Sequence, residues 1–431
     1  MEREGRGHLA LFAYYYPPLG GAGSQRALSC ARHLPALGWR VTVFTPRDGV
    51  YGTDGSLAGG DLPGVEVVRT GSFEVAALLR KWKPGSGGEE AGGKFVEEAP
   101  VGPVGAALRG LARRFLYFPD SARGWVRPAA AAALEVHRRD PFDVVLSTSP
   151  PLSGHLAAHR FARKAGLPFV LEFRDLPRNA VVDPSCREAR LVKGLADHAK
   201  SLVTVSPTCA RWFDGLAGAG RTRVVYNGFE PSPDAPAPGR EDRFEILYAG
   251  STYADRQDFR GFLGVLGEFR ASGTPWVLRM AGKIDPETRE RTEPFRAGGA
   301  LVEEGFVERR RVLELQATAA VVLVWAWEDA DPVGMGQVPA KMFEAVPSGR
   351  PILLVASPGS DAEAVGRRLG LAAVAHADLR EMTRRLGEIA AGRIPPGMTA
   401  DPGALEEFTR EAQAGILSGL LEEAAAPAVR T

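Results

Sequence analysis

The chain lacks the features typical of secreted, membrane-spanning or nucleic-acid-binding proteins. Its 431 residues include only three cysteines, which offer no metal-ligand spacing and fit a reducing compartment: Cys30, Cys186 and Cys209. A net charge of +1 argues against general binding to nucleic acid. The longest apolar run, residues 317–327, is too short to span a bilayer, and the charged first residues do not resemble a signal peptide. We therefore expect a cytoplasmic protein.

The composition and the hydrophobic pattern predict an α/β protein. Hydrophobic residues make up 45% and charged residues 24%, as in globular proteins, and the length predicts two domains. Short apolar runs alternate with helical stretches, which predicts parallel sheets flanked by helices. The strands expected in the first half are residues 8–16, 40–45, 65–69, 143–147, 169–173, 202–205 and 224–226. Those expected in the second half are residues 246–249, 277–281, 302–307, 321–325, 352–356 and 372–375.

A proline-rich segment separates the two halves. Residues 230–239 contain four prolines in ten positions, a density that an interior helix or strand cannot accommodate, so we predict a semi-rigid linker. The predicted organisation is an N-terminal domain at residues 1–230, a linker at 231–243, a C-terminal domain at 244–400 and a helical tail at 401–431.

Two segments of the first half stand apart from this pattern. Residues 84–93 are rich in glycine without apolar periodicity, which predicts a loop. Residues 104–117 predict a basic amphipathic helix. Its apolar face would consist of Val104, Leu108, Leu111 and Phe115, with Arg109, Arg113 and Arg114 elsewhere. Such a helix could rest on an anionic membrane surface, or it could pack on its own domain with solvated arginines.

The segment Lys341–Ile352 predicts a short helix that leads into a buried strand. Glu344 lies near the start of this helical segment, which ends at Gly349–Pro351. A carboxylate at such a junction suits hydrogen bonds from ligand hydroxyls, such as those of a ribose. It could equally be an exposed helical glutamate before an ordinary helix C-terminus.

A glycine-rich loop follows the first predicted strand. The segment Tyr14–Arg26 includes two prolines and three glycines, and a helix is expected to begin near Ser24. Gly21 and Gly23 would let backbone amides approach a phosphate at the positive end of that helix. The loop is not a dinucleotide fingerprint, because Arg26 occupies the third glycine position and the second strand lacks a terminal acid.

In the first half, further candidate residues follow predicted strands, at the edge where open parallel sheets bind their ligands. His155 comes one turn after Ser147–Pro151, and Arg174 and Asp175 end the next strand. His155 could instead be a structural histidine, and Arg174 and Asp175 could form a local ion pair.

In the second half, the strand ends carry small residues and cations. These candidates are Gly250, Ser251, Arg256, Lys283 and, beside a third strand, Val307. The two cations, the serine hydroxyl and nearby backbone donors could together hold a nucleotide diphosphate.

Taken together, these motifs resemble the GT-B fold glycosyltransferases of family 4, most of all the branch acting in bacterial polysaccharide and cell-envelope synthesis. The motifs are Tyr-Tyr-Pro-Pro-x-Gly-Gly-x-Gly with Arg26, Ser-x-Ser-Pro-Pro with His155, Phe-Arg-Asp, Tyr226-Asn-Gly-Phe-Glu230, Tyr-Ala-Gly-Ser-x-Tyr, and Lys-x-Phe-Glu with Gly-Arg-Pro. The likeness covers nearly the whole chain. It implies two Rossmann-like, doubly wound parallel-sheet domains facing each other across a cleft. The first would bind the acceptor and the second the nucleotide-sugar donor, and the last helix would return towards the first domain.

The resemblance also implies roles for individual residues. Glu344 matches the carboxylate that binds the ribose of the donor, and Arg256 and Lys283 match the pair that binds its diphosphate. Gly21 and Gly23 match the loop that approaches the phosphates. Family members transfer the sugar with retention of configuration, usually without a metal, so no cofactor is expected besides the donor substrate.

At the donor site, the chain departs from the family pattern in one respect. Many members carry two glutamates separated by seven residues, and Gly336 stands at the first of these positions. Gln337 or Lys341 could share the contacts with the donor sugar instead. Val307 falls where the family contacts the base through its backbone.

A second departure concerns the acceptor side. The histidine that many relatives place after the fourth strand is replaced by Ser149–Pro151. His155 or Asp175 would then be the group that takes the proton of the acceptor.

The predicted function is that of a retaining, metal-independent, hexosyltransferase-type enzyme of polysaccharide or glycoconjugate synthesis. Its donor would be a UDP- or GDP-sugar, and its acceptor a glycan, a lipid-linked sugar or a small molecule. Residues 104–117 would provide a peripheral membrane contact. Two alternatives are a catalytically weakened partner subunit that binds nucleotide sugars, and a sugar-nucleotide epimerase on the same fold.

Overall fold

The computed structural model describes residues 5–47, 62–72, 118–231, 244–271 and 275–426. The chain divides into two compact units. The first comprises residues 1–204, 210–225 and 414–431, and the second comprises residues 205–209 and 226–413. The short segment 205–209 therefore belongs to the second unit, although the boundary expected at residue 230 would assign it to the first.

In the described part of the first unit, seven parallel strands form one sheet with the order β3-β2-β1-β4-β5-β6-β7. The strands are β1 Gly7–Ala13, β2 Trp39–Pro46, β3 Val65–Thr70, β4 Val144–Ser149, β5 Phe169–Phe173, β6 Ser201–Thr204 and β7 Thr222–Val224. The chain leaves β1 towards β2 and β3 on one side, and continues from β4 to β7 on the other. This reversal lies between β1 and β4, the place where doubly wound sheets bind ligands.

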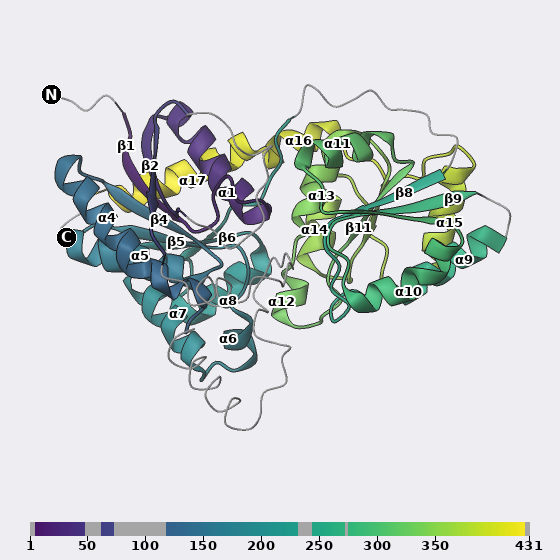
Figure 1. Cartoon of the computed structure of the whole chain (residues 1–431), viewed down its shortest axis with the longest axis horizontal. Coiled ribbons are helices and arrows are strands. Elements are labelled where there is room, and N and C mark those ends of the chain that lie inside the picture. Colours follow the sequence, from purple (N-terminus) through teal and green to yellow (C-terminus); the bar gives the residue numbers. More distant parts are fainter. Residues whose placement is uncertain (1–4, 48–61, 73–117, 232–243, 272–274, 427–431) are drawn as a thin grey trace, which may run out of the picture. The chain divides into compact units, whose positions relative to one another are not determined.

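Helices cover both faces of this sheet (Figure 1). The helices are α1 Ala22–His33, α4 Val126–Arg139, α5 Leu152–Ala165, α6 Arg178–Val182, α7 Arg187–His198, α8 Pro207–Ala217 and, from residue 414 on, α17 Arg410–Ala425. Alternate residues of β1 point to opposite faces. Leu9 and Leu11 pack with α1 and α17. Phe12 stacks on Phe44 and contacts the tilted ring of Phe161 on the face that α4 and α5 cover. Burial on both faces explains the continuous apolar runs of these strands.

The C-terminal helix α17 completes the core of the first unit. Leu417, Leu420 and Leu421 are buried beside α1 and β1, and the indole nitrogen of Trp39 donates to the Ser418 hydroxyl at 2.9 Å. Although α17 begins in the second unit, its residues from Ala414 onward belong to the first.

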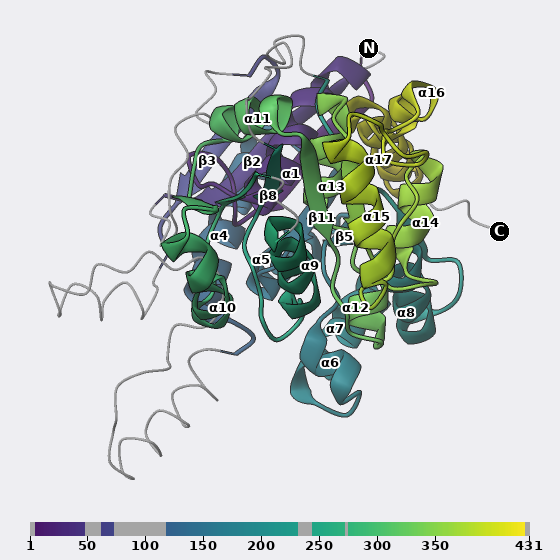
Figure 2. The same ribbon diagram turned by 90° about the vertical axis from the view of Figure 1, so that its right-hand side faces the viewer.

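The second unit contains a sheet of five parallel strands among its described residues, in the order β10-β9-β8-β11-β12. The strands are β8 Phe244–Ala249, β9 Trp276–Ala281, β10 Leu301–Gly305, β11 Val321–Trp325 and β12 Ile352–Val355. The helices are α9 Arg260–Ala271, α10 Pro286–Ala297, α11 Arg309–Thr318, α12 Pro332–Met335, α13 Ala340–Ala345, α14 Asp361–Arg368, α15 Leu379–Ala390 and α16 Pro402–Leu405. Helices α9 and α15 contact each other and bury the apolar core on one face, which includes Phe262, Leu266, Met382 and Leu386 (Figure 2). The chain reverses its direction across the sheet between β8 and β11.

The predicted fold class is confirmed, because both units are parallel α/β sheets. Strands β5 and β11 have the predicted bounds, and the other strands differ at one or both ends. The strand expected at 302–307 ends at Gly305, and that expected at 372–375 is reduced to an isolated bridge between Val374 and Val355.

Three of the predicted segments fall on residues that the structure does not describe, namely the loop at 84–93, the basic helix at 104–117 and nearly all of the linker at 231–243. Among the described helices, none combines the length and the hydropathy needed to cross a membrane.

A buried ion pair links α1 to the centre of the first sheet. Arg26 donates from Nε and Nη2 to one carboxylate oxygen of Glu172 in β5, at 3.0 and 2.7 Å. The two residues are 5% and 1% exposed, so either charge alone would be buried without compensation. Arg26 therefore has a structural role that also explains its place in the glycine-rich motif.

Replacing Arg26 by methionine should lower the free energy of unfolding of the first unit by about 3–5 kcal/mol, because Glu172 would remain buried without its partner. Denaturant titration would measure the change, and adding Glu172→Met should recover much of it. The matched control is Lys193→Met, which breaks an exposed i,i+4 pair with Asp197 and should cost about 0.5 kcal/mol or less. Equal losses in the two single variants would contradict a special role for the buried pair.

Candidate active site

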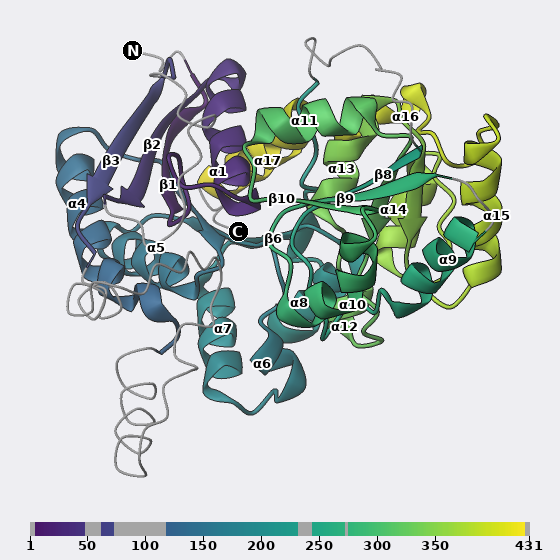
Figure 3. The same ribbon diagram turned by 45° about the vertical axis from the view of Figure 1, so that its right-hand side comes forward.

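The candidate donor site lies at the carboxyl ends of β8, β9, β10 and β11 in the second unit (Figure 3). The loops that leave these strands carry most of the residues singled out in the sequence. They include Gly250 and Ser251 after β8, and Lys283 after β9. The reversal between β8 and β11 makes this the edge where a doubly wound sheet binds a ligand.

Two glycines allow the first three loops to approach one another closely. Gly250 donates its amide to the Ala281 carbonyl at 2.7 Å, and Gly282 donates to the Gly305 carbonyl at the same distance. A Cβ on Gly282 would lie 2.4 Å from the Gly250 oxygen, and the φ of Gly282 is 141°. A side chain at position 282 would therefore force the β8 and β9 loops apart.

The same loops bring Ser251 and Lys283 into neighbouring positions. The amide of Thr252 donates to the Lys283 carbonyl at 3.0 Å, and the Thr252 hydroxyl donates to Asp285 at 2.7 Å. Asp285 in turn caps α10 by accepting from the Thr288 amide. Lys283 is an exposed residue at this edge. The capped helix thus fixes the backbone that carries the lysine.

Lys341 and Glu344 lie three residues apart in α13, so their side chains share one face of the helix. The Lys341 ammonium donates to the Tyr248 hydroxyl at 2.6 Å. A Cβ on Gly250 would lie 2.5 Å from this ammonium, so the lysine end rests against the β8 loop. Glu344 is near the end of the six-residue helix rather than near its start, and its carboxylate accepts no hydrogen bond from the described residues.

Arg256 lies further along the β8 loop, and an aromatic ring holds its side chain. Its guanidinium is 4.0 Å from the centre of the Trp327 ring, and its Nε is 3.8 Å from Asp255. Its carbonyl accepts from the Glu328 amide at 3.0 Å. Arg256 therefore connects the β8 loop with the segment that follows β11.

Two of the acids that precede Gly336 in the sequence, Glu328 and Asp331, accept hydrogen bonds within the protein. Glu328 accepts from the Asp258 amide at 2.5 Å and from the Trp325 indole at 3.1 Å. Asp331 caps α12 by accepting from two backbone amides. Neither acid replaces the carboxylate that the family pattern has at position 336. The side-chain oxygen of Gln337 accepts from the Trp327 amide at 3.3 Å.

Gly336 itself is packed within the second unit. A Cβ at this position would lie 2.8 Å from the Pro332 carbonyl oxygen, 3.0 Å from the Cys209 sulfur and 3.3 Å from the Thr208 Cβ. A side chain at position 336 would thus meet protein atoms. This chain therefore differs from the family pattern at position 336 in the space left for a side chain as well as in residue type.

Val307, expected to border the base, lies in the short connection between β10 and α11. It follows Phe306, which is 63% exposed, and precedes Glu308 at the N-cap of α11. Val307 is therefore at the same edge as the β8 and β9 loops, one strand further out.

In the first unit, the glycine-rich loop meets the residue that ends β5. Helix α1 begins at Ala22 with Gly21 as its N-cap, two residues earlier than expected, and Ser24 is buried. A Cβ on Gly23 would lie 2.9 Å from both terminal nitrogens of the Arg174 guanidinium. Arg174 donates to the Pro150 carbonyl at 2.9 Å. The structure thus gathers Gly21, Gly23 and Arg174, three residues from two strand ends.

The two residues expected to handle the acceptor proton differ in exposure. His155 is fully buried in α5, with Nδ1 2.7 Å from the Ser147 hydroxyl and its ring 4.5 Å from that of Phe173. Burial, with a smaller contribution from the charge of Arg174, lowers the pKa of His155 to about 3, so the ring is neutral. This burial argues against contact between His155 and an acceptor. Asp175 is exposed and forms no ion pair with Arg174 in the described structure.

Among the described residues, no group of three or more His, Cys, Asp or Glu side chains could hold a metal ion. The residue that the sequence reasoning missed is Tyr248, the partner of Lys341. Its alternation with Ile246 assigns it to the core, and a buried tyrosine hydroxyl needs a hydrogen-bond partner. That requirement was the available signal.

Comparisons with known proteins agree with this architecture. Residues 21–228 match the model of the glycosyl transferase 4-like domain. The structure is similar to sucrose-phosphate synthase from Thermosynechococcus elongatus, with a TM-score of 0.59, 16% identity and coverage of 96% of this chain and 98% of that one. It is also similar to Anabaena HepE in complex with UDP (TM-score 0.52, 15% identity, coverage 96% and 95%). A third similar structure is WaaG, a glycosyltransferase involved in lipopolysaccharide biosynthesis (TM-score 0.53, 14% identity, coverage 97% and 98%). No match was found among curated proteins.

The two parallel α/β units therefore define a GT-B fold of two Rossmann-like domains. The match over residues 21–228 identifies a glycosyl transferase 4-like domain in the chain, which confirms the resemblance to the family 4 glycosyltransferases.

Introducing the family-type carboxylate as Gly336→Glu should destabilise the second unit and should not improve donor binding. The added side chain would collide with Pro332 and Cys209, and overpacking of this kind costs about 1–3 kcal/mol. Thermal unfolding would measure the loss. The matched control is Gly264→Glu on the exposed side of α9, where a Cβ meets nothing within 4 Å and stability should hardly change. A Gly336→Glu variant as stable as Gly264→Glu would contradict the packing argument.

Proposed function

We propose that this protein is a retaining glycosyltransferase that transfers a hexose from a nucleotide-diphosphate sugar, without a metal ion. The observation that carries the proposal is the convergence of Gly250, Ser251, Lys283 and Lys341 with the carboxylate Glu344 on loops and a helix at one edge of the second sheet. This set supplies backbone approach, cations and a hydroxyl-binding carboxylate, which are the groups that a nucleotide-diphosphate sugar requires.

The charge distribution of this edge suits a departing nucleoside diphosphate. When the bond between the sugar and the diphosphate breaks, negative charge develops on the phosphate oxygens. Lys283 and Arg256 would stabilise this charge, together with backbone amides of the β8 loop. Stabilisation by fixed cations and dipoles requires no metal, which is the basis for proposing a metal-independent reaction.

Glu344 is proposed to bind the ribose of the donor. Its carboxylate accepts no hydrogen bond from the described residues, and it lies on the same helix face as Lys341. An ionised carboxylate accepts from both hydroxyls of a diol, so a ribose would occupy its acceptor capacity.

The acceptor is proposed to be a glycan, a lipid-linked sugar or a small molecule that binds to the first unit. The exposed Asp175 is the better candidate for taking its proton, since His155 is buried. A UDP- or GDP-sugar is the proposed donor class. Anabaena HepE, one of the similar structures, was solved with UDP.

A second candidate function is a partner subunit that binds nucleotide sugars with little turnover. The observation in its favour is Gly336, since a carboxylate cannot be accommodated there without displacing Pro332 or Cys209. Transfer or hydrolysis of donor by the wild type that is lost in Glu344→Ala and Lys283→Ala would exclude this candidate.

The first experiment is a thermal-shift panel of UDP-, GDP- and ADP-sugars, with and without a metal chelator. We expect one nucleotide class to raise the unfolding temperature, because a ligand that binds only the native state stabilises it by mass action. The chelator should leave this shift unchanged. Absence of stabilisation by every nucleotide and nucleotide sugar would contradict the proposed function.

For the nucleotide that binds, Glu344→Ala should weaken the affinity by about 10- to 100-fold, because hydrogen bonds to a charged group are lost. Isothermal titration calorimetry would measure it. Glu268→Ala, which removes an exposed glutamate from α9, is the matched control and should leave the affinity unchanged. Equal affinities in the two variants would refute the role of Glu344.

A further inference from the structure

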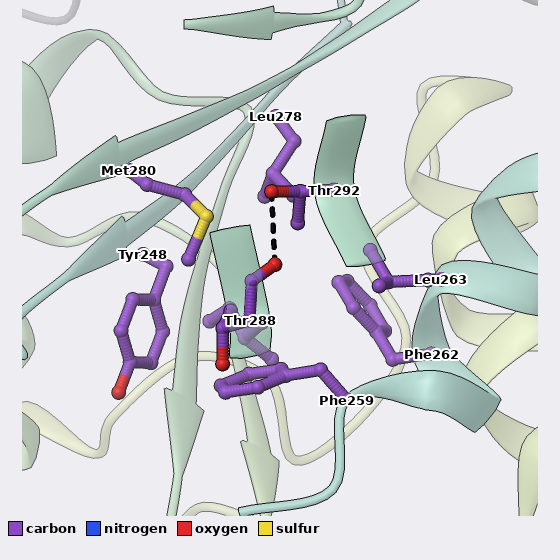
Figure 4. Close-up of a pocket in the computed structure, with 9 residues that line it drawn as sticks. Tyr248, Phe259, Phe262, Leu263, Leu278, Met280, Thr288 and Thr292 are labelled. Carbon is purple, nitrogen blue, oxygen red and sulfur yellow. Dashed lines mark hydrogen bonds between the residues drawn. The ribbon is translucent and has the colours of Figure 1, made fainter. Parts of the chain in front are cut away.

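Tyr248 joins the apolar core of the second unit to the candidate donor site. Tyr248 is fully buried, and its ring packs edge-on against that of Phe259, with the two ring centroids 5.4 Å apart. The ring lines a small apolar cavity with side chains that include Leu263, Leu278 and Met280. Figure 4 shows the Tyr248 hydroxyl directed away from the other labelled side chains. The core thus fixes the ring, and the position of the ring fixes that of the hydroxyl.

The hydroxyl of Tyr248 is placed between a donor and two acceptors. It accepts from the Lys341 ammonium at 2.6 Å, and its own proton can go to the Ser251 carbonyl at 2.9 Å or to the Gln257 side-chain oxygen at 3.4 Å. Gln257 is itself buried and held by the Trp325 carbonyl. The hydroxyl therefore has a fixed orientation with its lone pairs towards the lysine.

Lys341 is held by this hydroxyl and by the ring beneath it. Its Nζ lies 3.9 Å from the centre of the Tyr248 ring, a cation–π distance, and against the backbone of Gly250. Among the described residues, the Tyr248 hydroxyl is its one hydrogen-bond partner. Since an ammonium has three N–H donors, two remain available for a ligand at the β8 loop.

We propose that Tyr248 is a positioning residue that aims the Lys341 ammonium at the phosphate oxygens of the donor, beside Gly250 and Ser251. This inference rests on the proposed function, and it assigns Lys341 to the phosphates rather than to the sugar. Tyr248 acts through the lysine and does not itself touch the donor.

The groups around Lys341 predict a pH-dependent interaction. Burial lowers the pKa of Lys341 to about 7, against the attraction of Glu344 on its own helix, which raises it. On β8, burial raises the pKa of the Tyr248 hydroxyl, so this group stays neutral, with smaller contributions from Gln257, Tyr253 and Asp285. A bound phosphate would raise the pKa of Lys341, because an opposite charge favours the ammonium.

The sign of the pH effect follows from these shifts. Below pH 7 the lysine is already charged and the donor affinity should be constant. Above pH 7 the free protein must take up a proton to bind, so the dissociation constant should rise by up to tenfold per pH unit until the pKa of the bound state is reached. At pH 8, titrations in two buffers of different ionisation enthalpy should reveal uptake of a substantial fraction of a proton.

The central variant is Tyr248→Phe, which keeps the ring and removes the hydroxyl. Its dissociation constant for the nucleotide identified in the panel should rise about 3- to 10-fold at pH 8. The rise should be smaller at pH 6, because loss of an acceptor disfavours the charged lysine and shifts the pH profile to lower pH. A purely structural effect of the substitution would weaken binding equally at both pH values.

The matched control is Tyr226→Phe, which also removes a tyrosine hydroxyl that accepts from a cation, here Arg368 at 2.9 Å. The Tyr226 ring packs against those of Phe408 and Phe343. This control should leave both the affinity and the pH profile unchanged. Lys341→Met should abolish the pH dependence and the proton uptake.

Distinct outcomes separate this inference from the proposed function. If the wild type binds no nucleotide sugar, the proposed function fails and the inference fails with it. If the wild type binds but takes up no proton at pH 8, only the inference is overturned. The same holds if Tyr248→Phe keeps the affinity and pH profile of the wild type. The measurement of proton uptake by the wild type still tests the inference if the Tyr248→Phe variant does not fold.

Discussion

The close approach of the β8 and β9 loops is the constraint on which the second unit depends. A side chain on Gly282 would collide with the Gly250 carbonyl, and one on Gly250 would displace the Lys341 ammonium. Both residues also have positive φ values that other residues rarely adopt. These glycines let the ends of three strands lie close together. Backbone contacts therefore fix the positions from which the side chains of Arg256 and Lys283 extend. Preorganisation of this kind reduces the entropy lost when an anion binds.

The two units hold charged side chains in different ways. In the first unit, Arg26 and Glu172 neutralise each other inside the core, and the pair ties α1 to the sheet. In the second, Lys341 is held mainly by a neutral hydroxyl and an aromatic ring, with Glu344 acting only through its charge. The first arrangement is complete without a ligand. The second leaves a cation with unused donors, and such incomplete satisfaction is what an anion-binding site requires.

Short apolar runs between helical stretches predicted nearly every strand of both sheets. The reason is that the strands of a parallel sheet are buried on both faces and so have continuous apolar sequences. The same reasoning predicted that Gly250, Ser251 and Lys283 would lie together, since parallel strands end at one edge. It could not predict the partner of Lys341, because Tyr248 is 93 positions away and its core position conceals the polar end of its side chain. Nor could it predict that His155 is buried, since a histidine one turn into a helix can face either the core or the solvent.

The packing around Gly336 bears on how such a site can bind a sugar. A side chain at this position would have to displace the Pro332 carbonyl or the Cys209 sulfur before it could reach a ligand. The nearby Glu328 and Asp331 are engaged by backbone amides, so moving either towards a donor would leave those amides unsatisfied. If the donor binds as proposed, the charged side chains of the site contact its diphosphate and its ribose. The transferred sugar then meets mainly neutral groups such as Gln337. Selectivity for one hexose would then depend on neutral hydrogen bonds and shape, and the binding energy would depend chiefly on the nucleotide.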